Sequence, residues 1–318
     1  MRRRLFSGSA VAFLALVWGC AEPQSSSSIR PWNPDRADLL FYSNHEGNGE
    51  IYLLAAGTEE WVNLTEHPAG DNWPQWSPDG GRIAFQSNRN GNLDVFVMDA
   101  DGTNVVQLTD DPAHDYLPAW SPDGKRIAFV SWRIEPGDDE ENPANHVYIM
   151  NADGSDPARL LPDSPGTSAG VTWSPDGRFM LLARKISEQP PDVFVLDATG
   201  QIVRRLTDDS AANGAAIFSP DGKQVAFYSD SGAASKLVVI NVDGTVRREF
   251  ATTGQNWYPA WSPDGRWLVY TAANPDGGED DLDVMALPLD GLAAQAILAG
   301  GPGRQAEGQW RSTGSSQG

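Results

Sequence analysis

The sequence predicts an all-β protein: a six-bladed β-propeller of four-stranded blades. Two observations lead to this fold class, a repeat centred on Trp-Ser-Pro-Asp-Gly and two partial repeats at the chain ends that complement each other. A period of this length is the size of one propeller blade. The repeat aromatics recur at intervals of 44, 53, 45 and 43 residues, at Trp76, Trp120, Trp173, Phe218 and Trp261.

Each repeat divides into four short strands joined by tight turns. Ser-Pro-Asp-Gly has the composition of a type I turn, which joins the strand bearing the aromatic residue to a second strand such as 82–85. The third strand, such as 94–98, is apolar and β-branched and ends at an Asp-Gly hairpin. The fourth is a short edge strand, such as 105–109. We expect the repeated tryptophans to pack between blades.

The two chain ends supply the sixth blade. Residues 39–43, 50–54 and 61–65 match the second, third and fourth strands of a repeat, and residues 308–312 match only the first. Joining them closes the ring and removes the exposed edges that an open stack would have. The predicted propeller spans residues 38–313, and residues 314–318 are expected to form a disordered tail.

Residues 1–20 have the pattern of an export signal. Arg2, Arg3 and Arg4 precede an apolar run that ends at Gly19-Cys20, and Cys20 is the single cysteine of the chain, which excludes a disulfide framework. Residues 17–20 resemble the lipobox of bacterial lipoproteins, which implies lipidation of Cys20. The alternative is ordinary signal cleavage with an incidental cysteine. Serine-rich and proline-containing residues 21–37 predict a flexible tether.

The repeat unit as a whole resembles the propeller repeat of the TolB family. The shared features are Pro-x-Trp-Ser-Pro-Asp-Gly, an Ile-Ala-Phe strand, an Asp-Val-Phe strand and a terminal Leu-Thr, and they extend over residues 39–313. The resemblance implies the propeller fold and a location in the cell envelope. The separate resemblance to bacterial lipoproteins, with Ala21 after a lipidated Cys20, implies attachment to the outer membrane facing the periplasm, or to the cell surface. The same repeat also occurs in propellers attached to hydrolases, so it is less specific for activity.

A candidate ligand site is predicted on the face opposite the Ser-Pro-Asp-Gly turns, at the mouth of the axial channel. A polar residue precedes each repeat aromatic by five positions, and aromatic residues lie beside this polar set. The polar residues are Asp71, Asp115, Ser168, Asn213, Asn256 and Gln305, and the aromatic residues are Trp73, Tyr116, Trp257 and Tyr258. This composition suits a peptide or a small polar ligand. Alternatively, the polar residues only solvate the funnel and cap strands.

Charge narrows the classes of partner. The net charge of -20 excludes nucleic acid as an electrostatically favoured partner. Two acidic loops are expected opposite each other across the channel, where they would attract a basic peptide segment, or alternatively only add solubility. They contain Asp138, Asp139, Glu140 and Glu141 in one loop and Glu279, Asp280 and Asp281 in the other.

Three functions remain open from the sequence. The first is a non-enzymatic interaction module, tethered to the membrane through Cys20, that binds an envelope protein or ligand at the channel mouth. The second is an envelope carbohydrate- or peptide-active enzyme with Asp71, Asp115 and His114 as candidate acids or bases. The third is a scaffold that uses its blade edges. We expect no cofactor, no metal site and a monomeric propeller.

Overall fold

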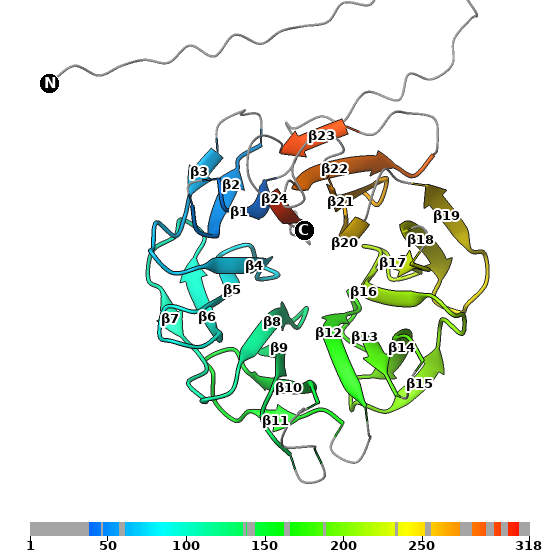
Figure 1. The fold of residues 1–318 in the computed structure, drawn as a ribbon, viewed down its shortest axis with the longest axis horizontal. Helices are drawn as coiled ribbons and strands as arrows, with labels where there is room; N and C mark the ends of the chain where they lie inside the picture. The colour runs from blue at the N-terminus through cyan, green and yellow to red at the C-terminus, as the bar shows by residue number, and fades with distance from the viewer. Residues whose placement is uncertain are drawn as a thin grey trace, which may run out of the picture. The chain divides into compact units, whose positions relative to one another are not determined.

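The computed structural model describes residues 38–45, 47–56, 61–135, 138, 144–161, 166–186, 189–232, 235–251, 256–273, 282–290, 296–299 and 305–311. These residues form six four-stranded antiparallel sheets, arranged radially around a central axis (Figure 1). The described residues contain no helix, and therefore none that is long and apolar enough to cross a membrane. The predicted fold class, a six-bladed β-propeller, is confirmed.

Five blades are continuous in sequence, and their strands follow one another outward from the channel (Figure 1). Blade 2 contains β4 (Asp71–Trp76), β5 (Arg82–Ser87), β6 (Asp94–Asp99) and β7 (Val106–Gln107). Blade 3 contains β8 (Asp115–Trp120), β9 (Arg126–Ser131), β10 (His146–Asn151) and β11 (Ala158–Arg159). Blade 4 contains β12 (Thr167–Trp173), β13 (Phe179–Lys185), β14 (Asp192–Asp197) and β15 (Ile202–Arg205). Blade 5 contains β16 (Ala212–Phe218), β17 (Gln224–Asp230), β18 (Ser235–Asn241) and β19 (Arg248–Ala251). Blade 6 contains β20 (Asn256–Trp261), β21 (Trp267–Ala273), β22 (Leu282–Pro288) and β23 (Ala296–Ala299).

Blade 1 closes the ring with strands from both ends of the chain. It combines β1 (Leu39–Ser43), β2 (Glu50–Leu54) and β3 (Trp61–Asn63) with β24 (Gln305–Trp310) as its innermost strand. β1 and β24 are antiparallel, with Leu39 opposite Trp310 and Ser43 opposite Gln305. The predicted closure is confirmed, although the innermost strand begins three residues earlier than the sequence pattern indicated.

The Ser-Pro-Asp-Gly turn is held by the same hydrogen bonds in each copy. In blade 2, the Gly80 N–H donates to the Ser77 carbonyl at 2.8 Å, and the Arg82 N–H donates to the Ser77 hydroxyl at 2.9 Å. The Ser77 hydroxyl in turn donates to Asp79 at 2.6 Å. These bonds confirm the predicted type I turn. Hydrogen bonds from Ser77 and Gly81 favour the charged carboxylate, which lowers the pKa of Asp79.

The repeated tryptophans pack between neighbouring blades, as predicted. Trp76 of blade 2 contacts a cluster that includes Leu40 and Ile51 of blade 1. An arginine from the preceding blade also lies over the indole: Arg311 is 4.9 Å from the centroid of Trp76, and Arg82 is 4.8 Å from that of Trp120. Cation–π contacts of this kind add to the apolar packing between blades.

The terminal Leu-Thr of the repeat pairs with the first residue of the third strand. The threonine hydroxyl donates to a buried carboxylate in three blades: Thr65 to Glu50, Thr109 to Asp94 at 3.1 Å, and Thr207 to Asp192 at 2.7 Å. The two parts of the repeat therefore occur together because each satisfies the other's buried polar group. Blade 3 departs from this pattern, since His146 and Leu161 occupy the two positions.

A candidate binding site in the axial channel

The innermost strand of every continuous blade contains a β-bulge. The register shifts once within β4, β8, β12, β16 and β20, where each pairs with the second strand of its blade. One residue at each bulge has a left-handed backbone: Trp73 (φ 57), Leu117 (φ 55), Gly170 (φ 87), Ala215 (φ 48) and Tyr258 (φ 55). Four of these five are not glycine, and this conformation costs a residue with a Cβ roughly 1–2 kcal/mol. A bulge redirects the side chains around it.

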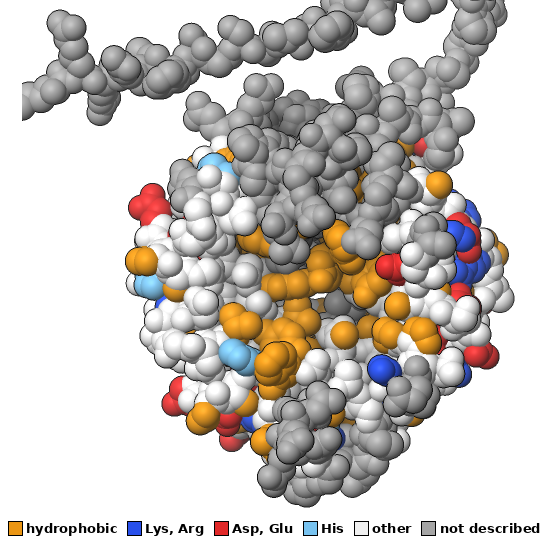
Figure 2. Space-filling model, viewed as in Figure 1, with side chains coloured by type: hydrophobic (Ala, Val, Ile, Leu, Met, Phe, Trp, Pro, Cys, Tyr) orange, Lys and Arg blue, Asp and Glu red, His pale blue; other side chains and the backbone are white. Residues whose placement is uncertain are grey.

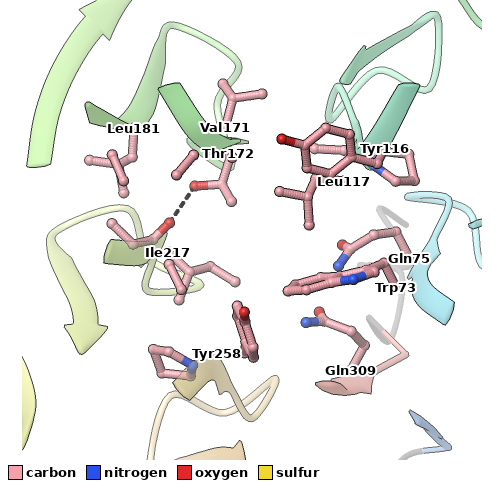
Figure 3. A pocket seen from close by; sticks show the side chains of 18 of the residues that line it. Trp73, Gln75, Tyr116, Leu117, Val171, Thr172, Leu181, Ile217, Tyr258 and Gln309 are labelled. Atoms are coloured by element: carbon pink, nitrogen blue, oxygen red, sulfur yellow. Dashed lines mark hydrogen bonds between the residues drawn. The ribbon is translucent and has the colours of Figure 1, made fainter. Parts of the chain in front are cut away.

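All five bulge residues line one cavity on the channel axis. The cavity has a volume of about 320 Å³, and its lining includes residues of all six innermost strands. Figure 3 shows side chains from several blades directed into it. In the space-filling view, apolar side chains surround the central hollow (Figure 2). The repeated bulge therefore builds a shared site from positions that are equivalent in the blades.

Aromatic side chains form much of the cavity wall. Trp73 and Tyr258 meet edge to face, with ring centroids 4.3 Å apart. The Tyr116 hydroxyl accepts a hydrogen bond from Nε1 of Trp132 at 2.9 Å, and Trp132 packs edge to face on His114. Burial raises the pKa of Tyr116, although the Trp132 N–H opposes the shift, so this hydroxyl stays protonated at neutral pH. The wall combines fixed aromatic rings with a hydroxyl that can donate.

The polar groups of the cavity are uncharged. Gln75 and Gln309 present their amide groups on either side of Trp73 (Figure 3), and the Thr172 hydroxyl donates to the Ala216 carbonyl at 2.7 Å. The residues that line the described cavity include no Asp, Glu, His, Lys or Arg. Such a site can bind and orient a neutral ligand, and it presents no acid–base pair to one.

Three of the four aromatic residues predicted at the channel mouth contribute to this cavity. Trp73, Tyr116 and Tyr258 all line it. Trp257 does not, and instead packs against the buried pair Tyr42 and Leu282. The bulge explains the difference, because the left-handed residue that follows Trp257 reverses the direction of successive side chains.

The two acidic residues of the predicted polar set are buried in ion pairs. Asp71 and Asp115 are fully buried and pair with Arg89 at 2.9 Å and Arg133 at 2.8 Å. Burial raises the pKa of Asp115, while hydrogen bonds from Ser131 and Arg133 oppose the shift. These carboxylates fasten the loop that follows the second strand onto the innermost strand.

The remaining members of that set follow the same trend where they are described. Ser168 is buried, and the buried Asn213 amide donates to Asp209 at 2.8 Å and to the Ala211 carbonyl at 3.0 Å. Asn256 and Gln305 are the first residues of β20 and β24, and their side chains lie outside the described part of the structure.

The candidate acids and bases each have a partner of their own. Nδ1 of His114 accepts the Leu93 N–H at 3.0 Å, while Asp71 and Asp115 hold their arginines. Among the described residues, no hydrogen bond or ion pair joins any two of these three groups. The same part of the chain contains no cluster of three or more His, Cys, Asp or Glu residues arranged to hold a metal ion.

Asp138 is the described member of the two predicted acidic loops. It accepts a hydrogen bond from His146 Nε2 at 2.8 Å and from the Glu135 N–H at 2.8 Å. Burial raises the pKa of Asp138, but these bonds outweigh it and lower the pKa overall. Arg159 donates to the other ring nitrogen of His146 at 2.8 Å. In blade 3 the third strand begins with His146 and not with a carboxylate, and Asp138 supplies the carboxylate that contacts this position.

Several other predicted residues lie outside the described part of the chain. They are Cys20, the tether 21–37, Asp139, Glu140, Glu141, Glu279, Asp280, Asp281 and the tail 314–318.

Comparison with known proteins gives two relatives that are similar in sequence. An uncharacterized protein, Atu1656, from Agrobacterium fabrum is 30% identical over 171 residues, which is 52% of this chain and 57% of that protein. The uncharacterized peptidase YuxL from Bacillus subtilis is 30% identical over 135 residues, 42% of this chain and 19% of YuxL. The chain thus spans less than two thirds of the length of these relatives.

A solved structure and a family model agree with the propeller. The crystal structure of TolB from Acinetobacter baumannii superposes with a TM-score of 0.75 at 19% identity, covering 89% of this chain and 68% of that one. The model of the TolB beta propeller domain matches residues 21–131 and 93–301. These matches include every strand except β24, and the chain belongs to the TolB beta propeller domain family.

Proposed function

We propose that this protein is a non-enzymatic binding propeller of the bacterial cell envelope, which receives a ligand or a segment of a partner protein in its axial cavity. The observation that carries the proposal is the cavity itself. It is lined from all six blades, it is largely apolar and aromatic, and its lining offers no charged group. Sites of this volume and character are typical of specific ligand binding.

Strained backbone at the cavity supports the same function. Four residues with side chains hold a left-handed conformation at the bulges, and each lines the cavity. Strain that is maintained by the surrounding structure is often associated with a functional site. The acidic net charge of -20 favours a neutral or basic partner over an acidic one.

Site-specific photocrosslinking in living cells tests the cavity. A photoreactive phenylalanine derivative at Tyr116 lies in the cavity wall, and the same residue at Val203, which is 52% exposed on β15, is the matched control. We expect adducts at position 116 that are absent at position 203. Identical adducts at the two positions, or none at position 116, would overturn the proposal.

Attachment to the membrane is a separate part of the proposal. The export signal followed by Cys20 and the resemblance to lipoproteins support a lipid anchor. Replacement Cys20→Ser is expected to move the protein from the membrane fraction to the soluble envelope fraction. Unchanged fractionation of the variant would contradict the anchor and leave the cavity proposal intact.

A peptide-active enzyme is the second candidate, because one of the relatives is named a peptidase. The match covers 19% of that relative, and the candidate groups Asp71, Asp115 and His114 are engaged in separate contacts. Cleavage of envelope peptides by the purified protein would favour this candidate over the first. The cleavage must persist in the presence of inhibitors that block contaminating serine proteases and metalloproteases.

A further inference from the structure

Three polar side chains of the axial cavity come from neighbouring blades, while the hydroxyls of Thr172, Tyr228 and Tyr258 come from the other three. Gln309 of blade 1, Gln75 of blade 2 and Tyr116 of blade 3 come from three consecutive blades, and we call them the polar edge. The positions equivalent to Gln75 and Gln309, directly before the repeat aromatic, are Thr172 in blade 4 and Ile217 in blade 5. The opposite wall is formed mainly by apolar residues such as Val171 and Ile217 (Figure 3).

The polar edge has hydrogen-bonding capacity that the protein does not use. The side-chain amides of Gln75 and Gln309 make no hydrogen bond to any described residue, and they face the cavity (Figure 3). The Tyr116 hydroxyl accepts from Trp132, and because indole nitrogen can only donate, the tyrosine proton must be directed elsewhere. No other described residue accepts it.

The chemistry of the two walls selects a ligand. Two side-chain amides can each donate and accept, and a phenol that already accepts one bond can donate another. An amide or carbonyl group of a ligand would satisfy these groups, while a flat apolar ring would occupy the space beside Val171 and Ile217. A charged group would lose its hydration in this lining without gaining an ion pair.

We propose that the axial cavity recognises an uncharged aromatic amide, with the amide bound by Gln75, Gln309 and Tyr116 and the ring held against the apolar wall. This inference rests on the proposed function and names the ligand chemistry of the same site. Two sources share this chemistry: a free aromatic carboxamide, and an aromatic residue with its own peptide groups.

Three probes of nearly equal shape test the selection by charge. Benzamide is neutral, benzoate is anionic and benzylammonium is cationic. Ligand-observed NMR with the purified propeller is expected to show saturable binding of benzamide, at least about 10-fold tighter than either charged probe. Equal binding of the three probes, or no saturable binding of benzamide, would overturn the inference.

Variants of the polar edge test where the amide binds. The double replacement Gln75→Leu and Gln309→Leu keeps side chains of similar size and is expected to weaken benzamide binding about 5- to 150-fold, since two neutral hydrogen bonds together contribute about 1–3 kcal/mol. Gln201→Leu, at an exposed position outside the cavity, is the matched control and should bind as the wild type does. Circular dichroism and thermal unfolding confirm that each variant is folded. Unchanged benzamide binding in the double variant would contradict the assignment.

A blocked amino acid separates the two sources. Tighter binding of N-acetylphenylalaninamide than of benzamide supports the proposal with a peptide as the source, and weaker binding supports it with a free small molecule. Failure of every amide probe together with specific crosslinking at position 116 would reject this inference and retain the proposed function. Loss of the crosslinks with retained benzamide binding would reject the proposed function and retain the assignment of an aromatic amide to the cavity.

Discussion

Asp94 shows how a single residue of the repeat couples stability to pH. Its carboxyl is 1% exposed, at the start of β6. Burial raises its pKa to about 6, Thr109 and Gln107 oppose this shift through hydrogen bonds, and the charge of Asp115 reinforces it. Between the ordinary value of 3.8 and about 6, the folded protein therefore retains a proton that the unfolded chain has released. The free energy of unfolding contributed by this group must fall as pH rises through that interval.

The replacement Asp94→Asn is expected to flatten this dependence. An amide does not titrate, so the variant should lose less stability than the wild type between pH 4 and pH 7, by up to roughly 3 kcal/mol for a shift of this size. Denaturant unfolding at several pH values measures the slope. Asp192→Asn is the control, because Asp192 begins the equivalent strand β14 but pairs with Arg205 at 2.5 Å. A slope that Asp94→Asn leaves unchanged would show that another group is responsible.

The innermost strands show what sequence patterns can and cannot predict about an element. Their positions, the turns that follow them and the interblade packing of Trp76 and Trp120 were all predictable from the repeat. The bulges were not. A residue before proline is expected to be extended, yet Trp73, Leu117 and Tyr258 each precede a proline and have a left-handed backbone. The pairing of the flanking residues overrides the local preference, and this inserted residue changes which side chains of the innermost strand point toward the cavity.

The bulge of β16 offers a direct test of this strain. Ala215 has φ 48, a conformation that glycine adopts without steric cost, so Ala215→Gly should raise the free energy of unfolding by about 0.5–1 kcal/mol. Ala216→Gly, at the next position, has no left-handed backbone to relieve and loses a buried methyl group, so it should lower stability by about 1 kcal/mol. Chemical denaturation of the two variants should therefore give changes in the free energy of unfolding that have opposite signs. Two changes of the same sign would contradict it.

At the scale of the whole molecule, the closure of the ring was the part most fully predictable. The fragments at the two ends of the chain were complementary, and the pairing of β1 with β24 follows from that complementarity. The cavity was less predictable, because its lining is assembled from residues of all six blades that lie far apart in the sequence. Its aromatic residues could be found from their place in the repeat. Gln75 and Gln309 had only the weak signal of a polar residue directly before the repeat aromatic, in strands that otherwise look like packing elements.

Arg311 links the closing strand to two other parts of the ring. It forms an ion pair with Asp38 at 2.9 Å, donates to the Gly80 carbonyl at 2.6 Å and lies over the ring of Trp76. Its side chain is 40% exposed, so screening by solvent limits the contribution of the ion pair. We expect Arg311→Ala to lower the free energy of unfolding by about 1–2 kcal/mol, mainly through the lost hydrogen bond and cation–π contact.

The location of the effect distinguishes closure from general packing. Arg82 makes the same contact with Trp120 between blades 2 and 3 but does not join the chain ends. Hydrogen exchange of the Arg311→Ala variant should accelerate at the amides that pair β1 with β24, because local opening of blade 1 no longer breaks the contacts of Arg311. Arg82→Ala should leave those amides protected as in the wild type. Equal acceleration in both variants would mean that the ring opens as one unit and that Arg311 does not stabilise the junction of the two chain ends separately.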